Sequence, residues 1–265
     1  MMVLSTTVLA CSPEQKQGTR DSDRGADQTT TRQETTSEVG AESATDQRGE
    51  TTTNDSPPRW DYVALGDSLA VGVGARRGYV TRYAEHLRSD TGARVRTINL
   101  GVSGQTSTQL LYTLRHDPAM RMDLRGAEVV TLNIGLNDLG QASGSYESGL
   151  CGGQQNKACL REAVDTVEQN WNAIVEEILA LRSPEETIIR TAGFGYTPRA
   201  GKPFEPYVVE TTRHITSTTA HNDIPSVEVR LGDAGMSKDD LHPNDRGYRV
   251  IADRLAHLGY EPLAD

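Results

Sequence analysis

A long stretch near the start of this 265-residue chain lacks the residues from which a hydrophobic core is built. Residues 12–58 contain no Leu, Ile, Phe, Tyr, Trp or Met and a single Val, and they are rich in Thr, Ser, Gln, Glu, Asp and Arg. Such a stretch cannot offset the entropy cost of ordering its backbone, about 1 to 2 kcal/mol per residue. We therefore expect residues 12–58 to be a disordered tether and residues 59–265, where apolar runs recur, to form one domain.

The chain also lacks a long apolar run and a basic cluster. No run of eighteen or more residues is apolar, so the sequence predicts no helix that spans a bilayer. The formal net charge is −10, and Lys and Arg are not concentrated in one segment. Phosphate binding needs a concentrated basic face, so these features argue against a nucleic-acid partner.

Residues 1–11 differ from the polar stretch that follows them. Met2 to Ala10 is short and mostly apolar, and with Cys11 it resembles a bacterial lipoprotein signal, whose Cys becomes the acylated N-terminus. Two departures are that no Lys or Arg precedes the apolar residues and that Leu9 stands where a small residue is usual. We expect Cys11 to be lipidated and the domain to be extracytoplasmic, tethered to a membrane. Plain secretion and a cytoplasmic protein with an incidental apolar start are the alternatives.

Cysteine is scarce, and two of the three cysteines lie close together in the expected domain. Cys151 and Cys159 flank a segment rich in Gly, Gln and Asn, where a disulfide would close a small ring. Two Cys without a nearby His are too few ligands for structural zinc. We expect a disulfide between them, in keeping with export.

Short apolar runs alternate with helical patterns from Trp60 onward, which is typical of βαβ units and a parallel sheet. The expected strands are Tyr62–Leu65, Val95–Leu100, Glu128–Ile134, Thr187–Thr191 and Ser226–Val229. Helical spacing is expected near residues 79–87, 110–114, 164–178, 207–219 and 250–258. Trp171 belongs to one of these apolar patterns and is expected in the core. Ligands bind at the carboxyl edge of such sheets, so the loops after the strands are where a site is sought.

Four loops at that edge carry residues suited to nucleophilic catalysis. Ser68 directly follows the first strand in a Gly-Asp-Ser-Leu turn, and Gly101 and Asn137 follow the second and third strands. Asp239 and His242 lie three residues apart before the last helix, so the carboxylate can bond one ring nitrogen while the other faces Ser68. The N–H groups of Ser68 and Gly101 and the Asn137 amide could form an oxyanion hole. Each motif alone could equally be a plain turn or helix start.

The four loops, in this order, resemble the sequence blocks of the SGNH hydrolases, the GDSL-type esterases and lipases, over about residues 60–259. The resemblance implies an α/β fold: a flavodoxin-like three-layer α/β/α sandwich with a five-stranded parallel sheet in the order 2-1-3-4-5. It further implies that Ser68 is the nucleophile, His242 the general base and Asp239 the residue that orients it. Ser68, Gly101 and Asn137 would form the oxyanion hole.

This assignment predicts a serine ester hydrolase that forms an acyl-enzyme on Ser68 without a metal or organic cofactor. Its substrate would be a small-molecule ester, a lipid or an acylated glycan, and the few aromatic residues favour short acyl chains. The alternatives are a carbohydrate esterase that deacetylates cell-wall or extracellular glycans and a non-catalytic binding domain. Phe194 and Tyr196 follow the fourth strand and are expected to contact substrate. Residues 140–159 are expected to be a lid or a long surface loop.

Two other interpretations of these segments are weaker. The glycines of residues 72–78 suggest a nucleotide-binding loop, but their spacing differs from Gly-x-Gly-x-x-Gly. The cluster of Asp239, Asp240, His242 and Asp245 could hold a divalent ion, yet one His with scattered carboxylates fits a catalytic triad and a helix start better.

Overall fold

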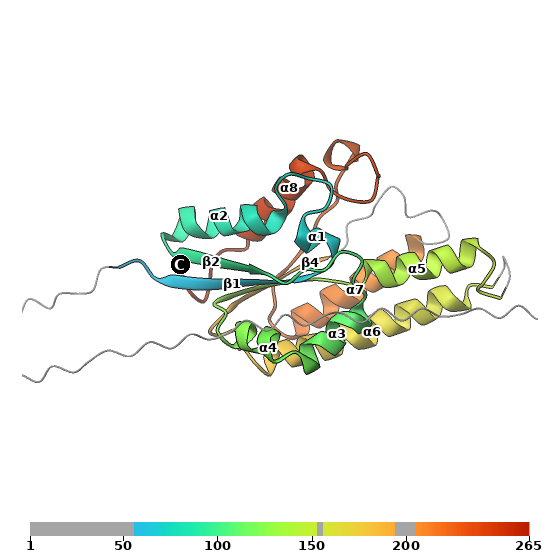
Figure 1. The fold of residues 1–265 in the computed structure, drawn as a ribbon, viewed down its shortest axis with the longest axis horizontal. Helices are drawn as coiled ribbons and strands as arrows, with labels where there is room; N and C mark the ends of the chain where they lie inside the picture. The colour runs from blue at the N-terminus through green and yellow to red at the C-terminus, as the bar shows by residue number, and fades with distance from the viewer. Residues whose placement is uncertain (1–55, 153–155, 194–204, 265) are drawn as a thin grey trace, which may run out of the picture. The chain divides into compact units, whose positions relative to one another are not determined.

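Five parallel strands form the centre of the structure (Figure 1). The computed structural model describes residues 56–152, 156–193 and 205–264. Its strands are β1 (Arg59–Gly66), β2 (Arg94–Asn99), β3 (Val129–Asn133), β4 (Ile188–Gly193) and β5 (Ser226–Glu228). They pair in the order β2-β1-β3-β4-β5, every pair parallel. The predicted α/β class, all five strands and their order are confirmed.

Helices cover both faces of this sheet (Figure 1). Along β1 the side chains alternate, so that Tyr62 and Ala64 face one core while Val63 and Leu65 face the other. The first core lies under α2 (Tyr79–Thr91) and α8 (Asp245–Ala256). The second lies under α3 (Ser107–His116), α4 (Pro118–Arg125), α5 (Leu136–Glu147), α6 (Ala158–Leu179) and α7 (Glu205–His221). Because both faces are covered, the central strand β3 is buried throughout.

Local sequence signals set the helix boundaries. Thr106 and Gln109 form a reciprocal capping box at the start of α3. Gly92 ends α2 in the left-handed conformation that favours glycine. The last helix ends at Ala256, so Leu258, which the apolar pattern included, lies beyond it. Trp171 is fully buried in the second core, as expected.

Residues 140–147 are helical, so the segment 140–159 is not a surface loop throughout, which corrects one of the two interpretations for this part of it. Its first part belongs to α5, which buries Leu139 and Ala142 against the second core. The sequence pattern missed this helix because its Gly and Ser residues are weak helix formers, and tertiary packing outweighs that preference. Whether the segment acts as a lid stays a prediction.

A disulfide joins Cys151, in the connection between α5 and α6, to Cys159 in the first turn of α6. Their Cα atoms lie 5.5 Å apart, within the usual range for a disulfide. The backbone N–H of Cys159 also approaches the sulfur of Cys151. The covalent ring therefore ties the connection between the two helices to the first residues of α6.

The chain enters the sheet just before β1, where the carbonyl of Pro58 accepts a hydrogen bond from the N–H of Arg94 at 2.7 Å. The lipoprotein-like segment, Cys11 and the tether up to residue 55 lie outside the described residues. Among the helices of residues 56–152, 156–193 and 205–264, none combines the length and apolar character needed to cross a bilayer.

Candidate active site

A tight turn after β1 places Ser68 at the carboxyl edge of the sheet. Gly66 adopts φ +142°, and a Cβ there would lie 2.3 Å from the backbone oxygen of Asn133 on β3, so only glycine fits. The chain then turns into the short helix α1 (Ser68–Val71), which Asp67 caps by accepting the N–H of Leu69. The buried hydroxyl of Tyr248 on α8 donates to the carbonyl of Val73 at 2.8 Å, just after α1. These contacts hold the Ser68 turn on both sides.

Ser68, His242 and Asp239 form one hydrogen-bonded relay. The hydroxyl of Ser68 lies 2.9 Å from Nε2 of His242, although the two residues are 174 positions apart. Nδ1 of His242 lies 2.7 Å from Oδ2 of Asp239. The structure therefore brings together the three residues that the sequence assigned to the catalytic set, in the order nucleophile, base and orienting carboxylate.

Asp239 remains ionised because hydrogen bonds from its own turn stabilise the carboxylate. Oδ1 accepts hydrogen bonds from the N–H groups of His242 and Leu241, each at 2.9 Å, and from the hydroxyl of Ser237 at 2.6 Å. Loss of water around Asp239 opposes ionisation, but these bonds outweigh it and hold the pKa of the carboxyl well below its usual value. The carboxylate keeps the negative charge that stabilises a protonated His242.

Asp67 is a second, buried carboxyl next to the nucleophile, and the sequence reasoning did not assign it a role. It is 1% exposed and accepts hydrogen bonds from the N–H of Leu69 at 3.0 Å and from Nδ2 of Asn133 at 2.9 Å. Burial raises the pKa of Asp67 from 3.8 to about 6, against those hydrogen bonds. Tyr79 on α2 completes the buried network by donating to Oδ1 of Asn133 at 2.9 Å. The sequence feature that could have indicated its importance is its position, directly between a buried strand and Ser68.

Gly101 does not supply a free oxyanion donor, which corrects the expectation from the sequence. Its N–H donates to Oδ1 of Asn99 at 3.0 Å. A Cβ at Gly101 would lie 2.7 Å from the Cβ of Ala70, so this glycine is needed for close packing of the loop against α1. The physical reason is local, because the side chain of Asn99 folds back over the turn and accepts the hydrogen bond of the Gly101 N–H.

Gly104, three residues further along, has an N–H that is free among the described residues, unlike the N–H of Gly101. It is exposed in the left-handed region at φ +80°, and nothing lies within 4 Å of the position its Cβ would occupy. Within the described part of the chain, neither its N–H nor that of Ser68 has a hydrogen-bond partner. The loop that carries Gly104 is tied to the nucleophile turn, because the N–H of Val102 donates to the carbonyl of Gly66 at 2.9 Å. The second glycine of the loop was the signal that the sequence reasoning passed over.

Asn137 contributes its side-chain amide on the β3 side of the site. Nδ2 donates to the carbonyl of Gln105 at 2.9 Å, immediately after Gly104. It also makes a long contact of 3.4 Å to Oδ2 of Asp67, which is beyond the usual hydrogen-bond distance. An oxyanion that forms here could therefore replace the weaker contact and leave the stronger one in place.

The start of α5, which carries Asn137, is held from two sides. Asp138 accepts hydrogen bonds from the N–H and the hydroxyl of Ser107 at the start of α3, at 2.9 and 2.7 Å. The indole N–H of Trp171 donates to the carbonyl of Ile134 at 2.9 Å, at the end of β3. The amide of Asn137 is therefore set in place by α3 and α6 before any substrate arrives.

The structure does not describe two of the residues that were expected to contact substrate. Phe194 and Tyr196, which the sequence assigned to substrate contact, lie outside the described residues, and their role stays a prediction. In the described ranges, no group of three or more His, Cys, Asp and Glu side chains is arranged to hold a metal ion.

Comparison with known proteins identifies the family of this chain. Residues 64–250 match the GDSL-like lipase/acylhydrolase family. The spore germination lipase LipC of Bacillus licheniformis is 27% identical over 213 residues, which cover 76% of this chain and 97% of LipC. The uncharacterized protein YpmR of Bacillus subtilis is 30% identical over 213 residues, covering 73% of this chain and 78% of YpmR.

Solved structures share the fold. The lipase Lip_vut3 from a goat rumen metagenome superposes with a TM-score of 0.69 at 25% identity, covering 77% of this chain and 99% of that one. The acetylxylan esterase Axe2 of Geobacillus stearothermophilus superposes with a TM-score of 0.56 at 18% identity, covering 77% and 95%. With the family match spanning most of the described domain, the chain belongs to the GDSL-like lipase/acylhydrolase family and is a carboxylic ester hydrolase of the SGNH type.

Proposed function

We propose that this enzyme cleaves carboxylic esters through an acyl-enzyme on Ser68. The observation that carries the proposal is the continuous relay from the Ser68 hydroxyl through His242 to Asp239, with spacings of 2.9 and 2.7 Å. Unrelated serine hydrolases use the same geometry, in which a carboxylate orients the imidazole that activates the hydroxyl. A non-catalytic binding domain would have no need of such a relay, so the geometry argues against that alternative.

The reaction proceeds in two half-reactions. Nε2 of His242 takes the proton of the Ser68 hydroxyl as Oγ of Ser68 bonds to the carbonyl carbon of the ester. The electrons of the C=O double bond move onto the carbonyl oxygen, which becomes the oxyanion. When the intermediate collapses, the alcohol leaves with the proton from His242 and the acyl group stays on Ser68. Water then attacks the acyl group, gives its proton to His242 and releases the acid, returning the proton to Ser68.

Three donors are available for the oxyanion that develops in each half-reaction. We assign the N–H of Ser68, the N–H of Gly104 and the amide of Asn137 to this role. The support is that both N–H groups are unpaired within the described residues and that Asn137 bonds the carbonyl next to Gly104. Removal of one such donor typically costs about 3 to 4 kcal/mol of transition-state stabilisation.

We propose acyl esters of short chain length as substrates. Among the described residues, the exposed apolar side chains in the segments that carry the relay and its neighbouring loop are few and of modest size: Val71 in α1, Val102 in the loop that bonds Gly66, and Leu241 beside His242. They offer limited apolar surface to an acyl group. Two lipases, LipC and Lip_vut3, match this chain over nearly their whole lengths, which supports acyl esters as the substrates rather than acetylated glycans. The acetylxylan esterase Axe2 is less similar in sequence and shows only the shared fold.

The test is hydrolysis of nitrophenyl esters from acetate to palmitate by the full-length protein, with acetylated xylan and peptidoglycan alongside. Ser68→Ala should lose ester turnover, whereas Ser103→Ala, an exposed serine in the loop after β2, should retain it. A sulfonyl fluoride should modify Ser68, located by peptide mass. Equal turnover by the wild type and Ser68→Ala would end the assignment of the nucleophile. Acetate release from glycan without turnover of the nitrophenyl esters would favour the carbohydrate-esterase alternative.

A further inference from the structure

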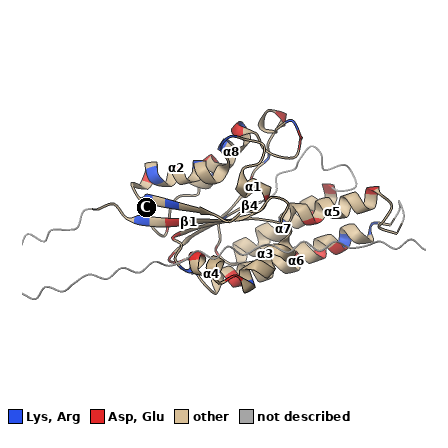
Figure 2. Cartoon of the chain, viewed as in Figure 1, with Lys and Arg blue, Asp and Glu red and all other residues tan. Residues whose placement is uncertain are grey.

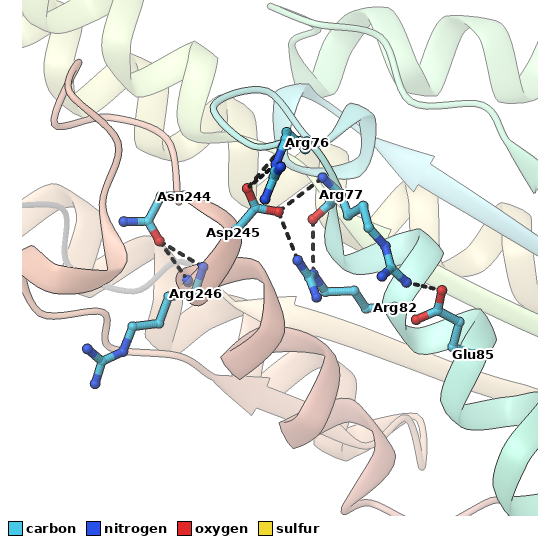
Figure 3. Close-up of polar contacts among 8 residues, drawn as sticks. Arg76, Arg77, Arg82, Glu85, Asn244, Asp245 and Arg246 are labelled. Atoms are coloured by element: carbon cyan, nitrogen blue, oxygen red, sulfur yellow. Dashed lines mark hydrogen bonds and ion pairs between the residues drawn. The ribbon is translucent and has the colours of Figure 1, made fainter.

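A cluster of charged side chains joins the start of α8 to the loop between α1 and α2 (Figure 3). At its centre is Asp245, the first residue of α8 and the third after His242. Its carboxylate accepts the backbone N–H groups of Arg76 and Arg77, each at 3.3 Å, and the guanidinium of Arg82 at 2.9 Å. Figure 3 shows these three donors converging on the one carboxylate, and Figure 2 shows the acidic start of α8 among the charges of the domain. Asp245 thus joins the loop to α8.

Arg82 makes the connection stronger than a surface ion pair. Its side chain is 10% exposed, and its Nε donates to the carbonyl of Arg77 at 3.1 Å while another nitrogen reaches Asp245. A buried guanidinium without a carboxylate partner is costly, so Arg82 depends on Asp245. Hydrogen bonds hold the pKa of Asp245 below its usual value and keep the carboxylate charged. The largest contribution comes from the N–H of Arg76, and smaller ones come from the Arg82 side chain and the N–H of Arg77. By contrast, Arg77 also pairs with Glu85, but both side chains are about half exposed.

The loop that Asp245 holds lies directly against the catalytic histidine. A Cβ on Gly74 would lie 2.9 Å from the Cβ of His242 and 2.7 Å from the carbonyl oxygen of Pro243. The same loop follows α1, and Tyr248 on α8 bonds its Val73 carbonyl. A shift of residues 72–78 would therefore change the contact with His242 at one end and with the Ser68 turn at the other.

Several further hydrogen bonds of the histidine loop lie within the C-terminal segment itself. The N–H of Ser237 donates to the carbonyl of His242 at 2.8 Å. Asn244 caps α8 and donates from its side chain to the carbonyls of Ala234 and Met236, at 3.0 and 2.7 Å. These bonds shape the loop, but they do not set its distance from α1. The contacts of Asp245 cross from one segment to the other.

We propose that Asp245 is a positioning residue for catalysis, which locks residues 72–78 to the start of α8 and so holds His242 in line with Ser68. The proposal rests on the proposed function of the Ser68–His242 pair. Asp245 touches neither the substrate nor the reacting atoms, so its loss should slow the chemical step and leave substrate affinity nearly unchanged. A displacement of about 1 Å at a reacting group can cost about a hundredfold in rate.

The experiment compares Asp245→Asn, Asp245→Glu and Ser68→Ala in the full-length protein. Glu85→Gln is the matched control, because it removes an exposed partner of the neighbouring Arg77. We expect Asp245→Asn to lower kcat by about ten- to a hundredfold with KM within twofold. The reason is that the NH₂ group of the new amide would face the N–H donors that the Asp245 carboxylate accepts. The rate at which a fluorophosphonate labels Ser68 should fall by the same factor. Asp245→Glu, which keeps the charge for Arg82, should recover part of kcat, and Glu85→Gln should match the wild type.

Circular dichroism and melting temperature establish that each variant is folded at the assay temperature. If Asp245→Asn does not fold, Arg82→Lys replaces it with the same expectation, since it keeps the charge but cannot bond both Asp245 and the Arg77 carbonyl. An unchanged kcat and labelling rate in the folded variant, or a loss confined to KM, would overturn the positioning role. If Ser68→Ala remains active, it is the proposed function that fails; if Ser68→Ala is inactive and Asp245→Asn is fully active, only this inference fails.

Discussion

Replacing Asp67 by asparagine should make the protein more stable at neutral pH and less active. Oδ1 of Asp67 accepts the N–H of Leu69 and the amide of Asn133, and an asparagine in the same orientation keeps both bonds. Oδ2 faces Nδ2 of Asn137 at 3.4 Å, so the new NH₂ group would face another NH₂ group. Asn137 must then move away. Because its amide is one of the three proposed oxyanion donors, we expect kcat to fall about a hundredfold or more.

The size of the stability change follows from the burial of Asp67. Burial raises its pKa from 3.8 to about 6. One pKa unit corresponds to about 1.4 kcal/mol, so ionised Asp67 costs the folded state about 3 kcal/mol. The folded state binds the proton more tightly than the unfolded state, so stability is lost as the pH rises through the window from 3.8 to about 6. The Asp67→Asn variant has no ionisable group at this position and should not show this loss.

Urea unfolding at a series of pH values, followed by the fluorescence of the buried Trp60 and Trp171, measures the effect. The free energy of unfolding of Asp67→Asn minus that of the wild type should rise by about 3 kcal/mol between about pH 4 and about pH 7. Other carboxyls titrate in both proteins and cancel in the difference. Glu85→Gln, an exposed replacement outside the buried network, is measured alongside as the control. Parallel stability curves, or full activity in Asp67→Asn, would refute the reasoning.

Three further changes test separate parts of the site. Asp239→Asn should lower kcat by about 10³- to 10⁴-fold, because an amide cannot both accept the backbone bonds and keep His242 in the correct tautomer; kinetics at saturating ester measures it. Asn137→Ala should lower kcat by about 10²- to 10³-fold with little change in melting temperature, and a large loss of stability instead would assign it a structural role. Removing the disulfide by Cys151→Ser and Cys159→Ser together should lower the free energy of unfolding by about 2 to 3 kcal/mol, from the length of the closed loop, without lowering kcat. A large fall in kcat would instead tie the connection between α5 and α6 to catalysis.

The strands and the order of the site motifs could be predicted because both depend on short-range sequence patterns. Alternating apolar residues such as Tyr62 and Val63 bury on opposite faces, and loops that follow parallel strands meet at one edge. The helix α5 could not be predicted in this way. Its sequence, Leu136–Glu147, is rich in weak helix formers, and packing of Leu139 and Ala142 against the second core stabilises it.

The oxyanion donors show a different limit of the sequence. Both Gly101 and Gly104 lie in the loop after β2, and either could offer an N–H. The choice depends on where the side chain of Asn99 folds and on the left-handed conformation of Gly104. Neither property follows from residue identity alone, and the position of the Asn99 side chain also depends on a contact between segments, because its Nδ2 donates to the carbonyl of Ala70 in α1.

The sequence by itself determined the family and the α/β class, and it singled out Ser68, Asp239 and His242 as candidates for the catalytic set, because these rest on residue order and on periodicity along the chain. The tertiary structure alone decided how closely Ser68 approaches His242, across 174 positions, and which N–H groups remain free. It also decided that Asp67 is a buried acid and that Asp245 joins two distant segments. These properties arise from desolvation and from contacts between residues far apart in the chain, which no local pattern encodes.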